Sequence, residues 1–381
     1  MDPPPNYLNL SKTSNQISQD EGFWRDKYWK DFGISESELM EGETWRERYK
    51  QRTIVGINSP ISGRWGHYGI IDQKGILYMA GNNRFGQLGN GTTIDSIRPM
   101  AIPFTKRVIG ISCERDYTAA LTADGKIYLW GDLSSLAQID EFLTGNIEWT
   151  KSGHIKPILT PRLFNFPHPA IKIHAGPCTL GIITTDQTPY FIDYTTPIDI
   201  KALDIDFVQN KYAIIGTDGK LYMWNFKSEQ PKHVPLPELI KQVSFGNSHY
   251  AVLSISGNVY IWGSNRFGEL GLPVIELKVP TKLDLPSPIS FISMGLDTSA
   301  ALTRDGKLYM WGSNFNGKIL NEDQAPDWVN LKPSGYISNY VPRPIQISIE
   351  RLVINYVEVS ETYTLAVTDD GAVNYWGWFN W

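Results

Sequence analysis

The chain has 381 residues, of which 41% are hydrophobic and only 20% charged, so it can fill a sizeable core and is not a disordered or coiled-coil chain. Its two cysteines, Cys113 and Cys178, exclude a disulfide framework, and its net charge of −5 excludes a broad basic surface for nucleic acid. The many Gly, Pro, Tyr and Trp residues favour strands and turns, and therefore an all-β fold.

The first residues, MDPPPNYLNLSK, lack the basic and apolar regions of a signal peptide. No apolar run approaches the roughly 18 residues of a membrane span. Residues 1–52 hold eight basic and ten acidic residues, so the start of the chain is not a basic arm. We therefore expect a cytoplasmic or nuclear protein with no membrane partner and no nucleic-acid partner.

Residues 18–50 predict two amphipathic helices. Each begins with an S-x-x-E capping box, at Ser18 and at Ser35, and Gly33 stands where the first helix should end. Each also carries a Trp and a Tyr four residues apart, which places them on one face: Trp24 and Tyr28, then Trp45 and Tyr49. The simplest interpretation of residues 1–52 is a helical cap that packs on the domain that follows.

From residue 53 to residue 381 one pattern recurs: an apolar strand, a turn with glycine, and a second strand that ends in aromatic residues and Gly. The copies begin at His67, Tyr117, Lys211, His249, Thr298 and Tyr363, with a degenerate copy at Cys178. Their turn positions are Gly75, Gly125, Gln187, Gly219, Gly257, Gly306 and Gly371, a mean step of about 49 residues. The Asp-Gly dipeptides predict hairpins with type I′ turns.

Further strands surround each hairpin. The two strands of each hairpin are here called B and C. An apolar strand, called strand A, precedes most hairpins at Val108, Ala170, Ile240, Ile289 and Leu352. A stretch with proline follows four of them at Arg98, Thr160, Val279 and Val341, which suits an edge strand D because proline cannot donate to a β-ladder. Four strands repeated seven times predict a seven-bladed β-propeller with strand A of each blade at the axis. The chain ends four residues after Gly377, so we expect three strands in the seventh blade unless another segment completes it.

The stretches GNNRFGQLGNG from Gly81, GSNRFGELG from Gly263 and GNSHYAVLS from Gly246 resemble the repeat of the regulator-of-chromosome-condensation family. The resemblance covers residues 53–381 and implies a seven-bladed propeller of that type, preceded by a short α-helical segment. The loop GDLSSLAQID after the second hairpin and the third copy, which lacks both Gly and Trp, depart from the family pattern.

Residues 8–50, with FWRDKYWKDFGI followed by ETWRERYKQR, resemble the second half of an F-box. The opening Leu-Pro helix of that family is missing here. The resemblance implies docking to a Skp-type adaptor through the helices that carry Trp24, Tyr28, Trp45 and Tyr49.

No side-chain constellation predicts catalysis, a cofactor or a metal. We interpret His67 and His249 as structural residues of the A-to-B turns that bond nearby backbone, and Cys113 and Cys178 as small buried residues. The Trp residues at the end of strand C read as repeat core: Trp130, Trp224, Trp262, Trp311 and Trp376. Asp204 and Asp206 form a lone carboxylate pair without further ligands. We expect a protein that is not an enzyme.

The leading hypothesis is a protein-interaction propeller that serves as substrate receptor or scaffold of a Skp, cullin and F-box type ubiquitin ligase. A second hypothesis, taken from the founding family, is a guanine-nucleotide exchange factor for a Ran-like small GTPase. A third is a purely structural interaction protein.

The partner site is predicted from loop lengths. The second and sixth C-to-D loops are about twelve residues longer than those of the first and fifth units, and both should rise from the face that holds the A-to-B turns. They and the strands that follow carry aromatic and arginine residues typical of interface hot spots: Trp149, His154 and Arg162, then Asp327, Trp328, Tyr336 and Arg343. The alternative is that these are solvated loops whose tryptophans pack on their own blade.

Overall fold

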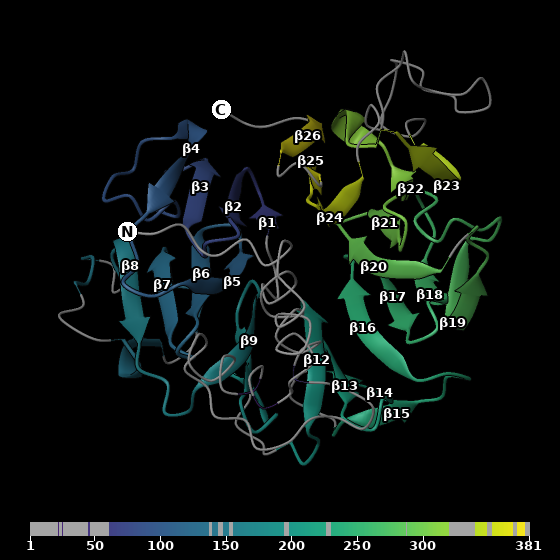
Figure 1. The fold of residues 1–381 in the computed structure, drawn as a ribbon, viewed down its shortest axis with the longest axis horizontal. Helices are drawn as coiled ribbons and strands as arrows, with labels where there is room; N and C mark the ends of the chain where they lie inside the picture. The colour runs from purple at the N-terminus through teal and green to yellow at the C-terminus, as the bar shows by residue number, and fades with distance from the viewer. Residues whose placement is uncertain are drawn as a thin grey trace, which may run out of the picture.

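The described residues form a ring of seven antiparallel sheets around a central axis (Figure 1). The computed structural model describes Gly22, Arg25, Trp45 and residues 61–136, 139–143, 148–151, 155–193, 198–225, 230–286, 288–319, 340–348, 353–368 and 372–377. The predicted all-β, seven-bladed propeller is confirmed. Each sheet is one blade, and the blades are numbered here in chain order.

Blades 1 to 3 come from the first half of the chain. Blade 1 holds β1 (Ile61–Arg64), β2 (His67–Ile71), β3 (Leu77–Gly81) and β4 (Ser96–Ile102). Blade 2 holds β5 (Val108–Cys113), β6 (Tyr117–Thr122), β7 (Ile127–Gly131) and β8 (Ile158–Phe164), with a short 3₁₀ helix η1 (Ile139–Glu141) between its last two strands. Blade 3 holds β9 (Ala170–Ala175), β10 (Leu180–Thr184) and β11 (Pro189–Phe191).

Blades 4 to 7 follow in the same way. Blade 4 holds β12 (Ala202–Val208), β13 (Lys211–Gly216), β14 (Leu221–Asn225) and β15 (Lys232–Val234). Blade 5 holds β16 (Ile240–Phe245), β17 (His249–Ser254), β18 (Val259–Ser264) and β19 (Glu276–Leu283). Blade 6 holds β20 (Ile289–Met294), β21 (Thr298–Thr303), β22 (Leu308–Ser313) and β23 (Tyr340–Ile347), with the 3₁₀ helix η2 (Phe315–Gly317). Blade 7 holds β24 (Ile354–Val359), β25 (Tyr363–Thr368) and β26 (Val373–Gly377).

The hairpins lie where the repeat predicts them, but the turns of blades 1 to 6 are not of type I′. In blade 2, Leu121 pairs with Ile127, so five residues lie between these two partners. The Gly125 N–H donates to the Thr122 carbonyl at 2.9 Å, and Gly125 has φ of 77° while the preceding Asp124 has no positive φ. A type I′ turn needs two left-handed residues, so these are longer hairpin loops with a single left-handed position. Gln187 fills that position in blade 3, with φ of 65°.

The proline-containing edge strands are confirmed as β4, β8, β19 and β23, each hydrogen-bonded to strand C of its own blade. Within the described residues, blade 7 has three strands, and so has blade 3. Strand C is therefore the outermost described strand of these two blades.

The predicted A strands are confirmed and lie innermost in Figure 1: β1, β5, β9, β12, β16, β20 and β24. The core does not lie at the axis but between the faces of neighbouring blades, where apolar residues from adjacent sheets meet. Trp130 and Trp311 are completely buried there, Trp224 and Trp262 are nearly so, and Trp376 is half-buried, in keeping with a role in the repeat core.

Gly-rich loops between strands C and D cover the seams between several blades. In three loops an Asn side-chain oxygen accepts the N–H of a buried aliphatic residue five positions later: Asn83 and Leu88, Asn265 and Leu270, Asn314 and Ile319. The residue before that aliphatic side chain turns its carbonyl onto the next blade, where it accepts from a Thr or Ser hydroxyl: Gln87 from Thr118, Glu269 from Ser299, Lys318 from Thr364. Blades 1, 5 and 6 are thereby fastened to blades 2, 6 and 7.

Few of the residues in the predicted N-terminal helices fall within the described part of the chain. Gly22, Arg25 and Trp45 are helical, and the Trp45 side chain is buried. Trp24, Tyr28 and Tyr49 lie outside the described residues. The boundary between residues 1–52 and 53–381 remains an expectation, because residues 46–60 are not described.

Candidate functional site

A ring of polar side chains surrounds the axis, one from each A strand. The residues share one register position, thirteen residues before the turn residue of their own hairpin: Ser62, Ser112, His174, Asp206, Ser244, Ser293 and Glu358. The sequence analysis passed over this position because its chemistry changes from blade to blade. Aligning the seven repeats on their turn residues reveals it, since it is polar in every copy.

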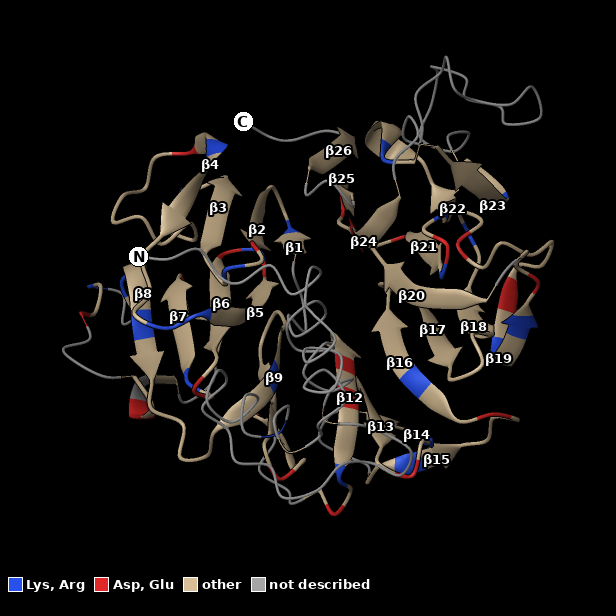
Figure 2. Cartoon of the chain, in the orientation of Figure 1, with Lys and Arg blue, Asp and Glu red and all other residues tan. Residues whose placement is uncertain are grey.

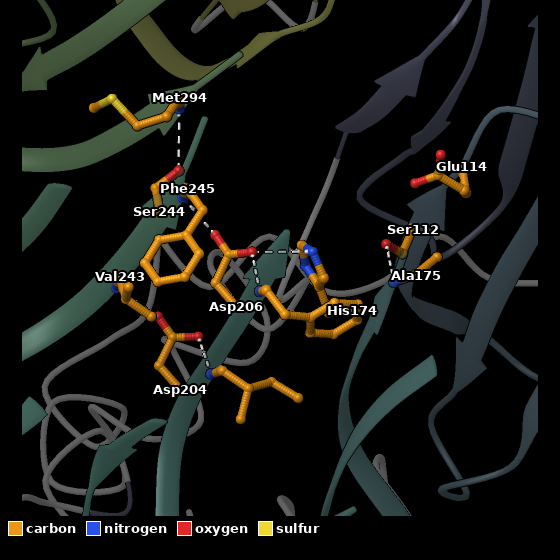
Figure 3. A network of polar contacts seen from close by, with 12 residues as sticks. Ser112, Glu114, His174, Ala175, Asp204, Asp206, Val243, Ser244, Phe245 and Met294 are labelled. Atoms are coloured by element: carbon orange, nitrogen blue, oxygen red, sulfur yellow. Dashed lines mark hydrogen bonds and ion pairs between the residues drawn. The ribbon is translucent and has the colours of Figure 1, made fainter. Parts of the chain in front are cut away.

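Each side chain of this axial ring binds the A strand of the next blade. Six of the seven accept a backbone N–H: Ser62 from Cys113 at 2.9 Å, Ser112 from Ala175 at 2.8 Å, Asp206 from Phe245 at 2.8 Å, Ser244 from Met294 at 3.0 Å, Ser293 from Val359 at 3.0 Å, and Glu358 from Gly63. Figure 3 shows the Ser112, Asp206 and Ser244 bonds. The axial ring therefore satisfies backbone groups that face the channel, and it closes from blade 7 onto blade 1.

The seventh contact, between blades 3 and 4, uses charged groups instead. His174 Nε2 lies 3.1 Å from Asp206 Oδ1 (Figure 3), and Lys172 pairs with Asp204 one step further along the same two strands. Asp204 also accepts the Val243 N–H at 3.0 Å. The two aspartates are thus held on both sides, and the expectation of a lone pair without supporting groups is wrong.

Burial controls protonation in the channel. It raises the pKa of Asp206 to about 7 and that of Glu358 to about 8, because each charged carboxylate loses water. It lowers the pKa of His174 to about 3, and the nearby positive charges of Arg64 and Lys172 lower it further. Both shifts favour the uncharged forms of His174 and Asp206. The His174 side chain keeps 29% of its surface exposed, so channel water moderates these effects.

Arg64 is the charged centre of the contact that closes the ring. Its guanidinium lies 3.0 Å from Glu361 of blade 7 and 3.1 Å from Glu114 of blade 2, and Glu361 also accepts the Trp65 N–H at 3.1 Å. The Tyr363 hydroxyl donates to the His67 carbonyl at 2.7 Å across the same seam. First and last blades therefore meet through side chains, since each sheet is built from consecutive strands.

The channel offers little room for a substrate. Its free space is about 170 Å³, below the roughly 300–1,000 Å³ of most small-molecule pockets. Its carboxylates already accept backbone N–H groups, which leaves them poorly placed as nucleophiles or bases. Within the described residues, no group of three or more His, Cys, Asp or Glu side chains could hold a metal ion. This arrangement fits a structural role in which the polar side chains hold neighbouring blades together.

The histidines and cysteines considered above as candidates for catalysis or metal binding lie in structural positions. His67 and His249 are completely buried, and each Nε2 lies 3.0 Å from a hydroxyl of the next blade, Thr118 or Ser299. Burial lowers the pKa of both histidines to about 3. Cys113 is buried, but Cys178 is exposed in the turn before β10, so the expectation of burial is wrong for that cysteine.

The predicted partner residues are only partly within the described chain. Trp149 lies in the second C-to-D loop, forms a β-bridge with Ile155 and is 51% exposed. Arg162 is half-buried on β8, and Arg343 is exposed on β23. His154, Asp327, Trp328 and Tyr336 lie outside the described residues. The two long loops belong to blades 2 and 6, which are not neighbours in the ring.

The face that holds the A-to-B turns and C-to-D loops, here called the loop face, carries most of the exposed large apolar side chains. Four are aromatic: Trp65, Trp149, Phe315 and Tyr340. The opposite face, with the hairpin turns, exposes only aliphatic side chains of this size among the described residues: Ile76, Leu239, Ile255 and Val353. The Arg115 guanidinium stacks over the Trp65 ring, 5.2 Å from its centroid. The loop face thus combines aromatic and arginine groups as protein interfaces do.

Charge is spread over the molecule. Figure 2 shows basic and acidic segments interspersed around the ring rather than gathered in one sector. In the described part of the chain, no helix reaches the length and hydropathy needed to cross a membrane.

Models of the Regulator of chromosome condensation (RCC1) repeat match residues 74–121 and 256–302, and a second model of this repeat matches residues 240–269 and 289–318. The chain therefore carries RCC1 repeats in its first, second, fifth and sixth blades. The solved structure of Prp20p from Saccharomyces cerevisiae superposes with a TM-score of 0.64 at 17% identity, covering 80% of this chain and 81% of that one. That likeness concerns the fold.

Curated relatives match over shorter stretches. The Regulator of chromosome condensation of Mus musculus is 26% identical over 157 residues, which is 40% of this chain and 35% of the relative. F-box only protein 24 of Mus musculus is 34% identical over 58 residues, which is 15% of this chain and 10% of the relative. The matched stretches thus span about a third or less of these relatives' own length.

Proposed function

We propose that the chain is a protein-interaction propeller that acts as substrate receptor or scaffold of a Skp, cullin and F-box type ubiquitin ligase. The observation that carries the interaction role is that four exposed aromatic side chains lie on the loop face: Trp65, Trp149, Phe315 and Tyr340. Large exposed aromatic side chains on a rigid frame are the groups that most often dominate protein–protein binding energy.

The ligase assignment is supported from a second direction. Residues 8–50 resemble the second half of an F-box, and F-box only protein 24 is among the relatives with similar sequence. A helical adaptor-binding segment followed by a propeller would let one end of the chain bind the ligase while the loop face selects the target. Trp45 is buried, so within this segment it serves packing better than direct contact with an adaptor.

Pull-down of the full chain with a purified Skp-type adaptor tests the ligase assignment. We expect a complex that Trp24→Ala combined with Tyr28→Ala weakens, because these side chains form the predicted apolar stripe of the first helix. Leu239→Ala, on the opposite face of the propeller, serves as the matched control and should leave the complex unchanged. Absence of adaptor binding by the unaltered chain would overturn the assignment.

The target site is tested separately on the loop face. We propose that Trp149, His154 and Arg162 of blade 2, and Asp327, Trp328, Tyr336 and Arg343 of blade 6, contribute to target binding. Replacing Trp149 and Trp328 by Ala should weaken capture of targets that co-purify with the full chain while leaving thermal unfolding unchanged. If binding persists and stability falls instead, the two tryptophans pack on their own blades and the target site lies elsewhere.

Guanine-nucleotide exchange on a Ran-like small GTPase is the second candidate, favoured by the 26% identity to the mouse Regulator of chromosome condensation over 157 residues. The structure of Prp20p was described together with its binding properties to Gsp1p and histones. Nucleotide release from a panel of small GTPases tests this candidate. Acceleration by the full chain that Trp65→Ala abolishes would favour exchange over the ligase role.

A further inference from the structure

Blade 4 has a shorter connection between strands C and D than the blades whose loops cover the seam to the next blade. Strand β14 ends at Asn225 and β15 begins at Lys232, so six residues separate strands C and D in blade 4. Blades 1 and 5 have fourteen and eleven residues there, including the Gly-Gln-Leu-Gly and Gly-Glu-Leu-Gly turns. Of the short connection in blade 4, residues 226–229 lie outside the described chain.

Between blades 1 and 2 the C-to-D loop of blade 1 packs closely against residues of blade 2. A Cβ added to Gly86 would lie 2.5 Å from Leu159 Cδ2, and one added to Gly89 would lie 2.7 Å from the indole nitrogen of Trp130. Between these glycines Leu88 is completely buried. The loop thus approaches so closely that only glycine fits at two positions, while leucine fills the space between the blades.

The seam between blades 5 and 6 repeats this geometry. Gly268 and Gly271 approach Pro342 and Trp311 in the same way, and Leu270 is completely buried between them. The Trp311 indole N–H donates to the Glu269 carbonyl at 2.8 Å. Two seams of this molecule therefore show how a Gly-x-Leu-Gly turn is bound.

Between blades 4 and 5 the residues that would contact such a loop are present, but blade 4 has no Gly-x-Leu-Gly sequence after strand C. A pocket of about 380 Å³ lies there, and its lining includes Trp262, Leu277 and Lys278. Leu277 pairs with Gly263 as Ile158 pairs with Gly131 in blade 2, so these three residues stand where Trp130, Ile158 and Leu159 hold the loop of blade 1. The pocket volume falls within the range of sites that bind small ligands or short peptides.

The sequence explains why blade 4 does not build such a loop. The covering loops follow a glycine at the end of strand C: Gly81 has φ of 112° and Gly263 has φ of 109°. A Cβ on Gly81 would lie 2.2 Å from the Gly66 carbonyl oxygen, so a side chain cannot replace it without a shift of backbone. Blade 4 has Asn225 at this position, with no positive φ, and its chain therefore leaves strand C in another conformation.

Charge around the pocket indicates which turn would fit. Lys211 occupies the position that His67 and His249 hold in blades 1 and 5; its ammonium lies 4.6 Å from the Tyr250 ring centroid and donates to the Tyr250 hydroxyl at 2.5 Å. Lys278 is exposed at the pocket edge, and Glu276 is the acidic residue in the lining. The lining thus carries one net positive charge, which favours an acidic residue beside the leucine.

We propose that this pocket binds a turn of a partner protein with the chemistry Gly-Glu-Leu-Gly, whose leucine enters between blades 4 and 5 and whose main-chain carbonyl accepts the Trp262 indole N–H. The proposal rests on the proposed function only in that the ring binds a protein. It requires neither the adaptor nor the long loops of blades 2 and 6.

The probe is the chain's own loop as a synthetic peptide, SNRFGELGL, corresponding to residues 264–272. We expect saturable binding to the full chain by isothermal titration calorimetry, with a dissociation constant on the order of 1 mM or lower. A peptide with aspartate in place of the inner leucine should not bind, because the apolar seat rejects a charge. Absence of binding by SNRFGELGL would overturn the proposal.

Variants locate the binding. Trp262→Phe keeps an aromatic ring but removes the donor, so the peptide should bind about fivefold more weakly. Trp311→Phe makes the same change at the covered seam between blades 5 and 6 and is the matched control, with no expected effect on the peptide. Equal affinities for the unaltered chain and Trp262→Phe would place the peptide elsewhere and overturn the proposal.

Charge variants give a second test in which folding is not at risk. Lys278→Glu reverses an exposed charge at the pocket edge and should weaken the peptide, whereas Lys282→Glu, further along the same strand β19, should not. Equal effects of the two variants would contradict the proposal. Sedimentation of the chain alone checks the other occupant: self-association that Trp262→Phe abolishes would mean that a second copy, not a partner protein, fills the pocket.

Discussion

The seam between blades 5 and 6 and the seam between blades 7 and 1 join equivalent sheets by different means. At the first, a loop of blade 5 lies on blade 6, buries Leu270 and turns the Glu269 carbonyl toward Trp311. At the second, Arg64 forms an ion pair with Glu361, and the Tyr363 hydroxyl donates a hydrogen bond to the His67 carbonyl. Each contact joins residues nearly 300 positions apart in the sequence. The repeat thus encodes its own seams with apolar and backbone contacts, whereas ring closure adds to the repeat contact of Tyr363 an ion pair of charged side chains that no repeat motif contains.

We expect the largest loss of stability at the seam between blades 5 and 6, which the loop of blade 5 covers. Trp311→Ala should lower the free energy of unfolding by about 3–5 kcal/mol, because it empties a completely buried site and leaves the Glu269 carbonyl without its indole donor. Trp262→Ala makes the same change at the uncovered seam between blades 4 and 5 and should cost less. Equilibrium denaturation of both variants provides the measurement, and equal losses would show that the loop adds nothing to the seam.

The second prediction concerns the charged closure. Arg64→Met should cost about 2–3 kcal/mol, because Glu114 and Glu361 remain buried, with side chains only 5% and 6% exposed, without their cation. The control is Lys156→Met, which removes an exposed partner of Glu148 and should leave stability almost unchanged. Hydrogen exchange should also quicken at the Gly63 amide in Arg64→Met, and unchanged exchange there would argue against closure through Arg64.

The same contrast explains what the sequence could predict. Hairpins and edge strands follow from glycine, proline and alternating apolar residues, which act locally, so the seven blades were predictable. The axial ring was missed because its members, from Ser62 to Glu358, share only polarity at one register position. Arg64, Glu114 and Glu361 could not be paired from sequence, because they lie in different blades and follow no common spacing.

Closure at the axis also predicts a pH effect. The pKa of Glu358 is about 8 in the folded chain, above its ordinary value, so the folded state holds a proton that the unfolded state releases. Stability should therefore fall as pH rises from 6.5 to 8, by at most about 1.4 kcal/mol per pH unit for this group. Asp206, with a pKa of about 7, contributes in the lower part of this range. The buried histidines, with a pKa of about 3 in the folded chain, take up protons on unfolding near pH 6.5 and oppose this slope there. Lys318, with a pKa of about 8, acts mainly above this range.

Glu358→Gln isolates the contribution of Glu358 to this slope. The amide oxygen can still accept the Gly63 N–H but takes up no proton, so the variant should lose less stability than the unaltered chain between pH 6.5 and 8. Urea denaturation at several pH values measures the difference. Parallel pH profiles for the two proteins would mean that Glu358 is already ionised in the folded ring.

The smallest predicted effect compares one hydroxyl at two seams. Tyr117 and Tyr363 occupy the same repeat position and are both buried; Tyr117 donates to the Gly176 carbonyl at 2.9 Å, and Tyr363 donates to the His67 carbonyl at 2.7 Å. Replacing either by Phe should cost about 1 kcal/mol, because a buried carbonyl loses a donor while packing is kept. The kinetic consequences should differ. Tyr363→Phe weakens a bond between the first and last blades and should speed unfolding if the ring opens at that seam first, whereas Tyr117→Phe acts between consecutive blades. Stopped-flow unfolding of the two variants measures this, and equal unfolding rates would show that the closing seam is not where the ring opens.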